Sequence, residues 1–406
     1  MSSRPEGVGE ALSASSVGAG ALVMLLTEVT VWRPVALVGL VLVCLGAVCV
    51  LVESRLAAAL TMVVVGSVAV VVAGVVAWSW WPVAGPSGET GGAGLCVLGG
   101  LGLTVTGGVR VGRAVHGWWR AVLGLAAVVL MYSLLMPLGV AVYATHSPTS
   151  GRHPTRPAAL PTSREVTVVT ADGVTLAGWY VPSTNRAAVV LLHGSSSDRT
   201  AVVGQAQVLT RHGYGVLMMD ARGQGASGGD VMKLGWSGDS DVVAQVDYLQ
   251  RQPDVDPQRV GAVGLSMGGE EALGAMAADG RIRATVAEGA TGRVLSDRAW
   301  LSDAFGVRGW LQRGVDRVTY TLTDLLTPAT PPISLGDAVA AAAPRPVLLI
   351  AGGATEEPFV DMAIRRRAPR SVVVWVVPSA GHTGGLSADP AGWEQRVVGF
   401  LDAALR

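Results

Sequence analysis

Residues 259–278 read RVGAVGLSMGGEEALGAMAA, and in them an apolar run leads through a glycine-rich turn into a helical pattern. The centre of this stretch reads G-x-S-x-G, with Ser266 between Gly264 and Gly268. A turn this sharp between a strand and a helix leaves no room for side chains on either side of the serine, so glycine is needed at both positions. The pattern predicts that Ser266 stands at the carboxyl edge of a sheet, near the positive end of the helix that follows.

Alternating strand and helix patterns surround this turn and predict one α/β domain over residues 163–406. Eight short apolar runs are separated by helical stretches, at residues 164–170, 174–181, 187–192, 215–220, 259–264, 284–288, 346–351 and 371–377. Such alternation is typical of a mostly parallel sheet with helices on both faces. Asp172-Gly173, between the first two runs, favours a tight hairpin, so we expect those two strands to be antiparallel.

Residues 291–343 interrupt the alternation between the sixth and seventh predicted strands. The segment holds Trp300, Phe305, Trp310 and Tyr320 in a helical-looking stretch, which three prolines follow. Long irregular insertions in compact domains are often functional. We interpret the segment either as a packed excursion of the chain or as a small helical lid whose aromatic face lines a substrate site.

A serine hydroxyl becomes a nucleophile only when a base takes its proton, and histidine suits that task near neutral pH. Of the six histidines, His382 lies in a loop of small residues directly after the last predicted strand, where the chain returns to the carboxyl edge of the sheet. We therefore expect His382 to be the general base. His193 ends the third predicted strand and is expected to shape a loop. The backbone N–H of Ser195 (or Ser196) would then form one half of an oxyanion hole, with the N–H of Met267 as the other half.

Taken together, these patterns resemble the α/β-hydrolase superfamily of serine hydrolases over about residues 164–405, in its branch of membrane-tethered esterases and acyl-peptidase-like enzymes. The residues that carry the resemblance are Asp172-Gly173-x-x-Leu176-x-Gly178-Trp179, His193-Gly194, Asp220-x-Arg222-Gly223-x-Gly225-x-Ser227, the turn at Ser266, and Gly381-His382. The resemblance implies the chain order nucleophile, acid, histidine. It also implies that Asp220 and Arg222 form a structural turn and take no part in catalysis.

The acid is the point where this sequence departs from the family pattern. The resemblance places an aspartate shortly after the seventh strand, but the commonest position falls on Thr355, followed by Glu356 and Glu357. A carboxylate is needed to hold the tautomer of the imidazole and to stabilise its cation. Glu356 is our first choice and Glu357 the second, with Glu288 as a more distant alternative.

Residues 1–150 differ in composition from the rest of the chain, since they carry only 11 of its 60 charged side chains. After an N-terminal segment at 1–34, four apolar runs are long enough to be membrane spans and define a transmembrane domain at 35–145. They lie at residues 35–52, 56–81, 93–109 and 121–143. Residues 146–162 are rich in Pro, Ser, Thr and Arg and are expected to be a linker.

Arginine placement predicts the orientation of these spans. Arg110, Arg113 and Arg120 lie between the third and fourth runs, whereas the loop at 82–92 has no basic residue. By the positive-inside rule, the arginine-containing loop faces the cytoplasm, and the second half of this multi-pass protein is expected to be extracytoplasmic. The four runs contain no Asp, Glu, Lys, Arg or His, which favours an anchor over a transporter.

Several other functions are disfavoured by the sequence. The net charge is zero, and no basic patch suggests a nucleic-acid partner. The three cysteines lie in apolar stretches and the carboxylates are scattered, so we expect no metal site and no cofactor. The sequence therefore predicts a membrane-anchored serine hydrolase that cleaves carboxylic ester or thioester bonds through an acyl-enzyme on Ser266. The expected substrate is a small acyl ester or a lipid-like molecule. The alternative is a non-catalytic membrane receptor or scaffold with a hydrolase-like domain.

Overall fold

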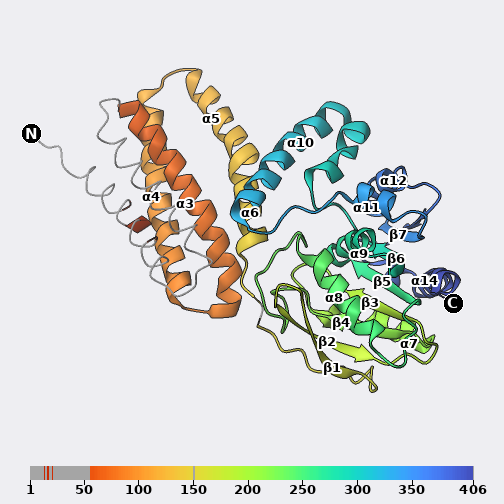
Figure 1. The fold of residues 1–406 in the computed structure, drawn as a ribbon. Helices are drawn as coiled ribbons and strands as arrows, with labels where there is room; N and C mark the ends of the chain where they lie inside the picture. Colours follow the sequence, from red (N-terminus) through yellow and green to blue (C-terminus); the bar gives the residue numbers. More distant parts are fainter. Residues whose placement is uncertain (1–12, 14–15, 18–20, 22–54, 150, 406) are drawn as a thin grey trace, which may run out of the picture. The chain divides into compact units, whose positions relative to one another are not determined.

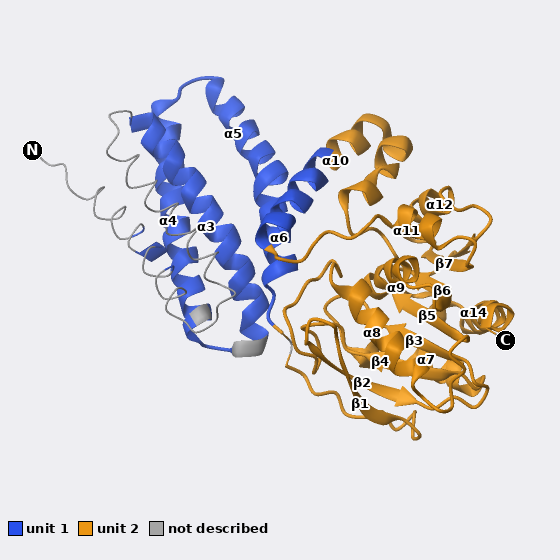
Figure 2. Cartoon of the chain, in the orientation of Figure 1, with its two compact units in different colours: residues 1–148, 314–326 blue, residues 149–313, 327–406 orange. Residues whose placement is uncertain are grey.

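The computed structural model describes residues 13, 16, 17, 21, 55–149 and 151–405 (Figure 1). The chain divides into two compact units (Figure 2). Unit 1 comprises Met1–Pro148 and Gly314–Leu326, and unit 2 comprises Thr149–Arg313 and Thr327–Arg406.

Unit 2 contains one eight-stranded sheet with the order β1-β2-β4-β3-β5-β6-β7-β8. The strands are β1 (Arg164–Val169), β2 (Thr175–Val181), β3 (Ala188–Leu192), β4 (Gly215–Met219), β5 (Val260–Leu265), β6 (Ile282–Glu288), β7 (Val347–Gly352) and β8 (Val372–Val377). β1 pairs antiparallel with β2, and β2 with β4, whereas every other neighbouring pair is parallel. The predicted eight-stranded, mostly parallel sheet is confirmed, including its antiparallel start.

Helices cover both faces of this sheet because its central strands are apolar on both sides. In β3, Val190 and Leu192 pack into one core and Val189 and Leu191 into the other. The first core also holds α8 (Gly238–Gln250), α9 (Met267–Ala278), α11 (Leu335–Ala342) and α12 (Glu357–Arg365). The second holds α7 (Val203–Arg211) and α14 (Pro390–Leu405), while the short α13 (Gly385–Ala388) precedes α14. The parallel strands thereby deliver their carboxyl ends to one edge of the sheet.

The segment between β6 and β7 contains η4 (Leu295–Arg298), α10 (Trp300–Leu326) and α11. The rings of Trp300 and Phe359 stack with centroids 6.1 Å apart, and Phe305 lies against both. At Gly306 the backbone leaves helical geometry, with φ 53° and ψ −127°. The last part of α10, Gly314–Leu326, groups with unit 1.

The described part of unit 1 contains three apolar helical segments long enough to cross a membrane: residues 55–82, 90–114 and 119–146. They are formed by α3 (Arg55–Ala84), α4 (Gly88–Ala114), and the continuous run of α5 (Trp119–Leu130), a π-helix (Met131–Leu135) and α6 (Met136–His146). The predicted runs at 56–81, 93–109 and 121–143 fall within these segments. The predicted run at 35–52 lies outside the described residues.

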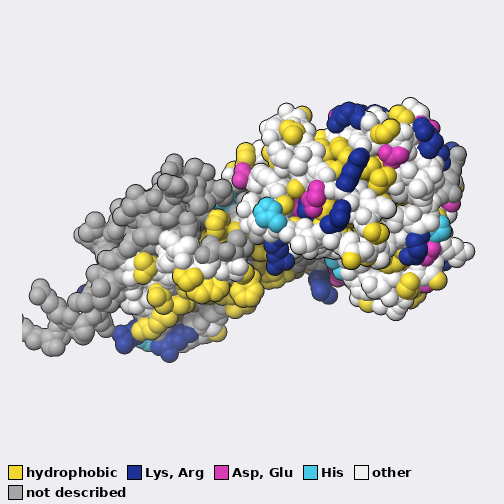
Figure 3. Space-filling model, turned by 90° about the horizontal axis from the view of Figure 1, so that it is seen from below, with side chains coloured by type: hydrophobic (Ala, Val, Ile, Leu, Met, Phe, Trp, Pro, Cys, Tyr) yellow, Lys and Arg dark blue, Asp and Glu magenta, His cyan; other side chains and the backbone are white. Residues whose placement is uncertain are grey.

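Glycines allow α3 and α4 to approach closely. A Cβ atom on Gly66 would lie 2.5 Å from the carbonyl oxygen of Gly100, and one on Gly100 would lie 2.7 Å from that of Gly66. In Figure 3 the visible face of the described part of unit 1 carries many hydrophobic side chains, with basic side chains gathered at one end. Charged side chains of both signs are spread over unit 2. The two units therefore have the surface chemistry that the sequence predicts for a membrane segment and a water-facing domain.

Candidate active site

Ser266 occupies the sharp turn between β5 and α9. Its backbone has φ 53° and ψ −122°, a left-handed conformation that costs a non-glycine residue roughly 1–3 kcal/mol. A Cβ atom on Gly264 would lie 2.2 Å from the carbonyl oxygen of Gly268, and one on Gly268 would lie 2.6 Å from that of His193. Both neighbouring positions must therefore be glycine. The Ser266 N–H donates to the carbonyl of Glu288 at 2.7 Å, which ties the turn to β6.

His382 lies in the loop after β8, as the sequence predicts. Its Nε2 atom is 2.9 Å from Ser266 Oγ. Gly289, at the end of β6, makes room for the ring, because a Cβ atom there would lie 3.0 Å from His382 Cε1. The structure thus brings together the serine and the histidine chosen from the sequence, in a geometry that lets the imidazole take the hydroxyl proton.

The carboxylate on the other side of the imidazole belongs to Glu357. His382 Nδ1–H donates to Glu357 Oε1 at 2.6 Å, and Glu357 Oε2 accepts the backbone N–H of Gly352 at 2.7 Å. Glu357 is only 2% exposed. The pair satisfies the requirement for a carboxylate that fixes the imidazole tautomer.

The structure corrects the choice of acid. Glu357, the second choice, contacts His382, and Glu356, the first choice, does not. The local turn explains the difference. Thr355 Oγ1 donates to the Gly352 carbonyl at 2.7 Å and accepts the Glu357 N–H at 3.1 Å. This turn starts α12 so that Glu357 faces inward, while Glu356 is the exposed residue that precedes the helix.

Glu288, the more distant alternative, serves the loop that carries His382. It is buried, and its carboxylate accepts the N–H of Gly385 at 2.7 Å and the indole N–H of Trp393 at 3.1 Å. Burial raises the pKa of Glu288. Its hydrogen bonds hold the chain directly after His382 against β6.

The electrostatics of the site favour the protonated imidazole. The hydrogen bond that His382 donates to Glu357 raises the pKa of His382 above its ordinary value, and burial acts in the opposite direction. The charges of Glu357, Glu270 and Glu288 raise the pKa further. A base with this environment holds a transferred proton well, because the cation that forms lies beside a carboxylate.

His193 has the structural position predicted for it. It is buried, its Nδ1–H donates to the Gly194 carbonyl at 2.7 Å, and its Nε2 accepts the N–H of Ala221 at 2.9 Å. Burial lowers the pKa of His193. These contacts fix the loop after β3, where a Cβ atom on Gly194 would lie 3.2 Å from Ser266 Cβ. Ser195 on this loop and Met267 at the start of α9 remain the predicted oxyanion donors.

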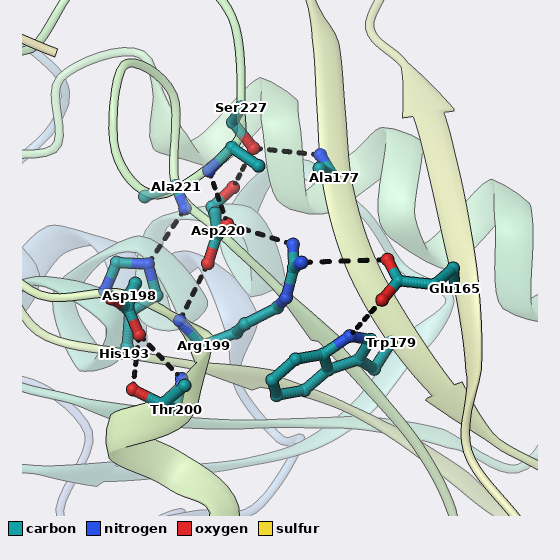
Figure 4. A network of polar contacts seen from close by, with 11 residues as sticks. Glu165, Ala177, Trp179, His193, Asp198, Arg199, Thr200, Asp220, Ala221 and Ser227 are labelled. Atoms are coloured by element: carbon teal, nitrogen blue, oxygen red, sulfur yellow. Dashed lines mark hydrogen bonds and ion pairs between the residues drawn. The ribbon is translucent and has the colours of Figure 1, made fainter. Parts of the chain in front are cut away.

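Figure 4 shows a polar network under this loop that sequence reasoning found only in part. Asp220 is fully buried and accepts the backbone N–H of Arg199 at 2.7 Å, Arg199 Nη1 at 2.9 Å and the N–H of Ala226 at 2.8 Å. The guanidinium of Arg199 also lies 4.5 Å from the ring centroid of Trp179. Asp220 therefore has the structural role that the resemblance implied. The burial of Arg199 could not be predicted from the sequence. Arginine is rarely buried unless it is paired, and its partner Asp220 is brought to it only by the fold.

A cavity of about 390 Å³ adjoins Ser266 and His382. It is lined by residues of the loop after β3, of η3 (Arg199–Val202) and α7, and of the segment after His382. Their positions are Gly194, Ser195, Ser197, Ala201, Gly204, Gln205, Leu265, Ser266, His382, Thr383, Leu386 and Ser387. Within the described part of the chain, no group of three or more His, Cys, Asp and Glu side chains could hold a metal ion.

The sequence of the β-sheet domain identifies the protein family. A model of the alpha/beta hydrolase family matches residues 189–395. The chain therefore belongs to the alpha/beta hydrolase family. Its fold is that of a hydrolase.

Three similar proteins illustrate the relationship. An esterase from Pyrococcus furiosus superposes with a TM-score of 0.51 and 25% sequence identity, covering 63% of this chain and 98% of that one. An uncharacterized protein of Mycobacterium tuberculosis is 36% identical over 130 residues, which are 31% of this chain and 46% of that protein. Thiohydrolase aneE of Aspergillus aculeatus is 34% identical over 130 residues, 30% of this chain and 40% of that protein. The chain thus spans less than half the length of these two sequence relatives.

Proposed function

We propose that this protein is a membrane-anchored serine hydrolase that cleaves carboxylic ester or thioester bonds through an acyl-enzyme on Ser266. The observation that carries the proposal is the pair of contacts on His382. Its Nε2 is 2.9 Å from Ser266 Oγ, and its Nδ1 is 2.6 Å from Glu357 Oε1. A hydroxyl, an imidazole and a carboxylate in this order form the unit that activates serine in acyl transfer.

In the acylation step, Ser266 Oγ attacks the carbonyl carbon of the substrate while His382 Nε2 takes the hydroxyl proton. The electron pair of the carbonyl bond moves onto its oxygen, and the N–H groups of Met267 and Ser195 donate to the resulting oxyanion. Glu357 stabilises the imidazolium. His382 then gives the proton to the leaving oxygen or sulfur as its bond to carbon breaks, which leaves the acyl group on Ser266.

In the deacylation step, water replaces the leaving group. His382 takes one proton of the water as its oxygen attacks the acyl carbon. The tetrahedral intermediate then collapses, the proton passes to Ser266 Oγ, and the carboxylic acid leaves. Two of the similar proteins are named an esterase and a thiohydrolase, which supports ester or thioester bonds as the target.

The apolar helices of unit 1 support the membrane anchor. Three segments, residues 55–82, 90–114 and 119–146, have the length and composition of membrane spans. We expect the full chain to stay in the membrane pellet after extraction with alkaline carbonate and to enter solution with detergent. Release by carbonate alone would contradict the anchor.

The experiment that tests the catalytic proposal is hydrolysis of short p-nitrophenyl esters and thioesters by the full chain in detergent. We expect Ser266→Ala to lower kcat by on the order of 10⁶. Ser240→Ala, on the outer side of α8, serves as the matched serine control. Equal rates for Ser266→Ala and the wild type would contradict the proposal. Absence of any Ser266-dependent hydrolysis would instead favour the non-catalytic receptor or scaffold.

A further inference from the structure

Gln205 is a buried polar side chain that the proposed reaction does not use. It lies on α7, lines the cavity beside Ser266 and His382, and is only 6% exposed. Its carboxamide makes no hydrogen bond with any residue that the structure describes. The amide is not among the polar atoms that the described part of the structure seals away from solvent without a partner, so it is open to the cavity. It is therefore available to pair with a ligand bound there.

The helix holds Gln205 at this wall. Ala201, Gly204 and Gln205 follow the i, i+3, i+4 spacing that places residues on one side of a helix, and all three line the cavity. A Cβ atom on Gly204 would lie 3.3 Å from Leu386 Cδ2, so the helix packs closely against the segment after His382. The network of Figure 4 fixes the start of this helical segment, because Asp220 accepts the Arg199 N–H.

The cavity around Gln205 is polar but carries little charge. Its other polar side chains are the hydroxyls of Ser195, Ser197, Ser266, Thr383 and Ser387 and the imidazole of His382. None of the described residues that line it is Asp, Glu, Lys or Arg. A charged substituent would therefore lose its hydration without gaining an ionic partner. A carboxamide, in contrast, can both donate to and accept from an uncharged oxygen or nitrogen.

The acyl part of the substrate becomes bonded to Ser266, which lines the same cavity as Gln205. The acyl group stays bonded to Ser266 through both steps, whereas the leaving group takes its proton from His382, whose side chain is 48% exposed. The leaving group can therefore depart toward solvent. A polar side chain in the cavity that Ser266 lines can therefore contact the acyl group in both steps.

We propose that Gln205 selects the substrate by hydrogen bonding to an uncharged polar substituent, such as a hydroxyl, keto or amide group, on a short acyl chain. This inference rests on the proposed function. It assigns the enzyme to oxygenated or amide-bearing acyl esters and thioesters, in preference to plain alkyl esters of the same size.

The test compares two esters of matched shape, p-nitrophenyl 3-hydroxybutyrate and p-nitrophenyl 3-methylbutyrate, with the full chain in detergent. The measured quantity is the ratio of their kcat/KM values. We expect Gln205→Leu to lower this ratio about tenfold relative to the wild type, since a neutral hydrogen bond to the substrate is lost. Gln205→Asn, which keeps a carboxamide, should retain part of the preference. Gln207→Leu changes the same residue type on the same helix, outside the cavity lining, and should keep the wild-type ratio.

Comparison of ratios removes the intrinsic difference in reactivity between the two esters. Gln205→Met provides a second apolar variant if Gln205→Leu fails to fold. Wild-type ratios in both apolar variants would overturn the inference while leaving the Ser266 mechanism intact. Hydrolysis of both esters that persists in Ser266→Ala would instead overturn the proposed function itself, and the two failures are thereby distinguished.

Discussion

At the scale of single residues, the imidazole of His382 is held on both nitrogens. Ser266 Oγ lies on one side, and the buried Glu357 lies on the other. Glu357 is itself fixed by the N–H of Gly352. The ring therefore has a defined tautomer and orientation before any substrate binds, which is the preorganisation that acyl transfer needs.

Two adjacent glutamates allow a sharp test of this arrangement. We expect Glu357→Gln to lower kcat by about 10³–10⁴, because the ring loses the group that holds its tautomer and stabilises its cation. Glu356→Gln removes the neighbouring, exposed carboxylate and should have a rate within about twofold of the wild type, as is usual for exposed positions. Steady-state kinetics on a p-nitrophenyl ester would check both. The opposite order of effects would show that the wrong acid has been chosen.

The pH profile provides a second test at this scale. His382 must be neutral to act as a base, so kcat/KM should rise with pH as His382 loses its proton. The midpoint should lie above the ordinary histidine pKa, because Glu357 raises the pKa of His382. Glu357→Gln should move the midpoint down in its residual activity. A raised pKa also means that protonated His382 stabilises the folded chain at low pH, and that this contribution is lost as the pH rises through the folded-state pKa. A midpoint at or below the ordinary value in the wild type would contradict this account.

The sequence could point to Ser266 and His382 because each has a local context that limits its position. The glycines around Ser266 dictate a turn, and His382 follows the last strand. The choice between Glu356 and Glu357 had no such support, because adjacent residues at the start of a helix face different directions and the hydrogen bonds of Thr355 decide which one turns inward. Gln205 was missed for a similar reason, since its burial depends on packing against a distant segment.

At the scale of elements, the connection from β5 to α9 depends on the lack of side chains at its glycines. The carbonyl carbon and oxygen of Gly268 lie 2.3 and 2.2 Å from where a Cβ atom on Gly264 would be. Backbone atoms of the same turn cannot move aside without displacing Ser266. The glycine at this position is therefore a packing requirement of the strand–helix connection as well as part of a sequence pattern.

We predict that Gly264→Ala destabilises the chain by about 3 kcal/mol, the upper part of the range for overpacked positions. For a domain of this size, that loss corresponds to a decrease in Tm of about 6–12 °C. Gly280→Ala is the matched control, because a Cβ atom there would meet nothing within 4 Å. Thermal unfolding of the full chain in detergent, followed by tryptophan fluorescence, would measure both. An unchanged Tm in Gly264→Ala would contradict the tight turn.

Strands were the most predictable elements, because runs such as Val347–Gly352 are short, apolar and bounded by turns. The insertion between β6 and β7 was harder to predict. Its helical pattern was visible, but the departure from helical geometry at Gly306 and the grouping of Gly314–Leu326 with unit 1 depend on contacts with residues far away in sequence.

At the scale of the whole molecule, a chain with two kinds of surface suggests a hydrolase domain held at a bilayer. Three apolar segments were predictable from hydropathy alone, because a span needs about 20 consecutive apolar residues and little else. Arg110, Arg113 and Arg120 lie between the second and third of the described apolar segments or near their ends. Their clustering is the basis for proposing that the hydrolase domain is extracytoplasmic.

Sidedness can be measured in intact cells. We expect protease added from outside to digest the hydrolase domain of the full chain, while a cytoplasmic marker protein stays intact. Replacing Arg110, Arg113 and Arg120 with Gln should weaken or invert this orientation, since positive charges near the ends of spans determine it. Complete protection of the domain in intact cells, with digestion only after lysis, would contradict the proposed orientation.

Covalent labelling of the serine shows whether His382 activates Ser266. The full chain in detergent would be treated with a fluorophosphonate, which reacts with activated serines, and the modified residue would be located by peptide mass spectrometry. We expect one adduct, on Ser266, which is lost in Ser266→Ala and strongly slowed in His382→Ala. A folded wild-type chain with no adduct on Ser266, or an adduct that forms equally fast without His382, would contradict this activation.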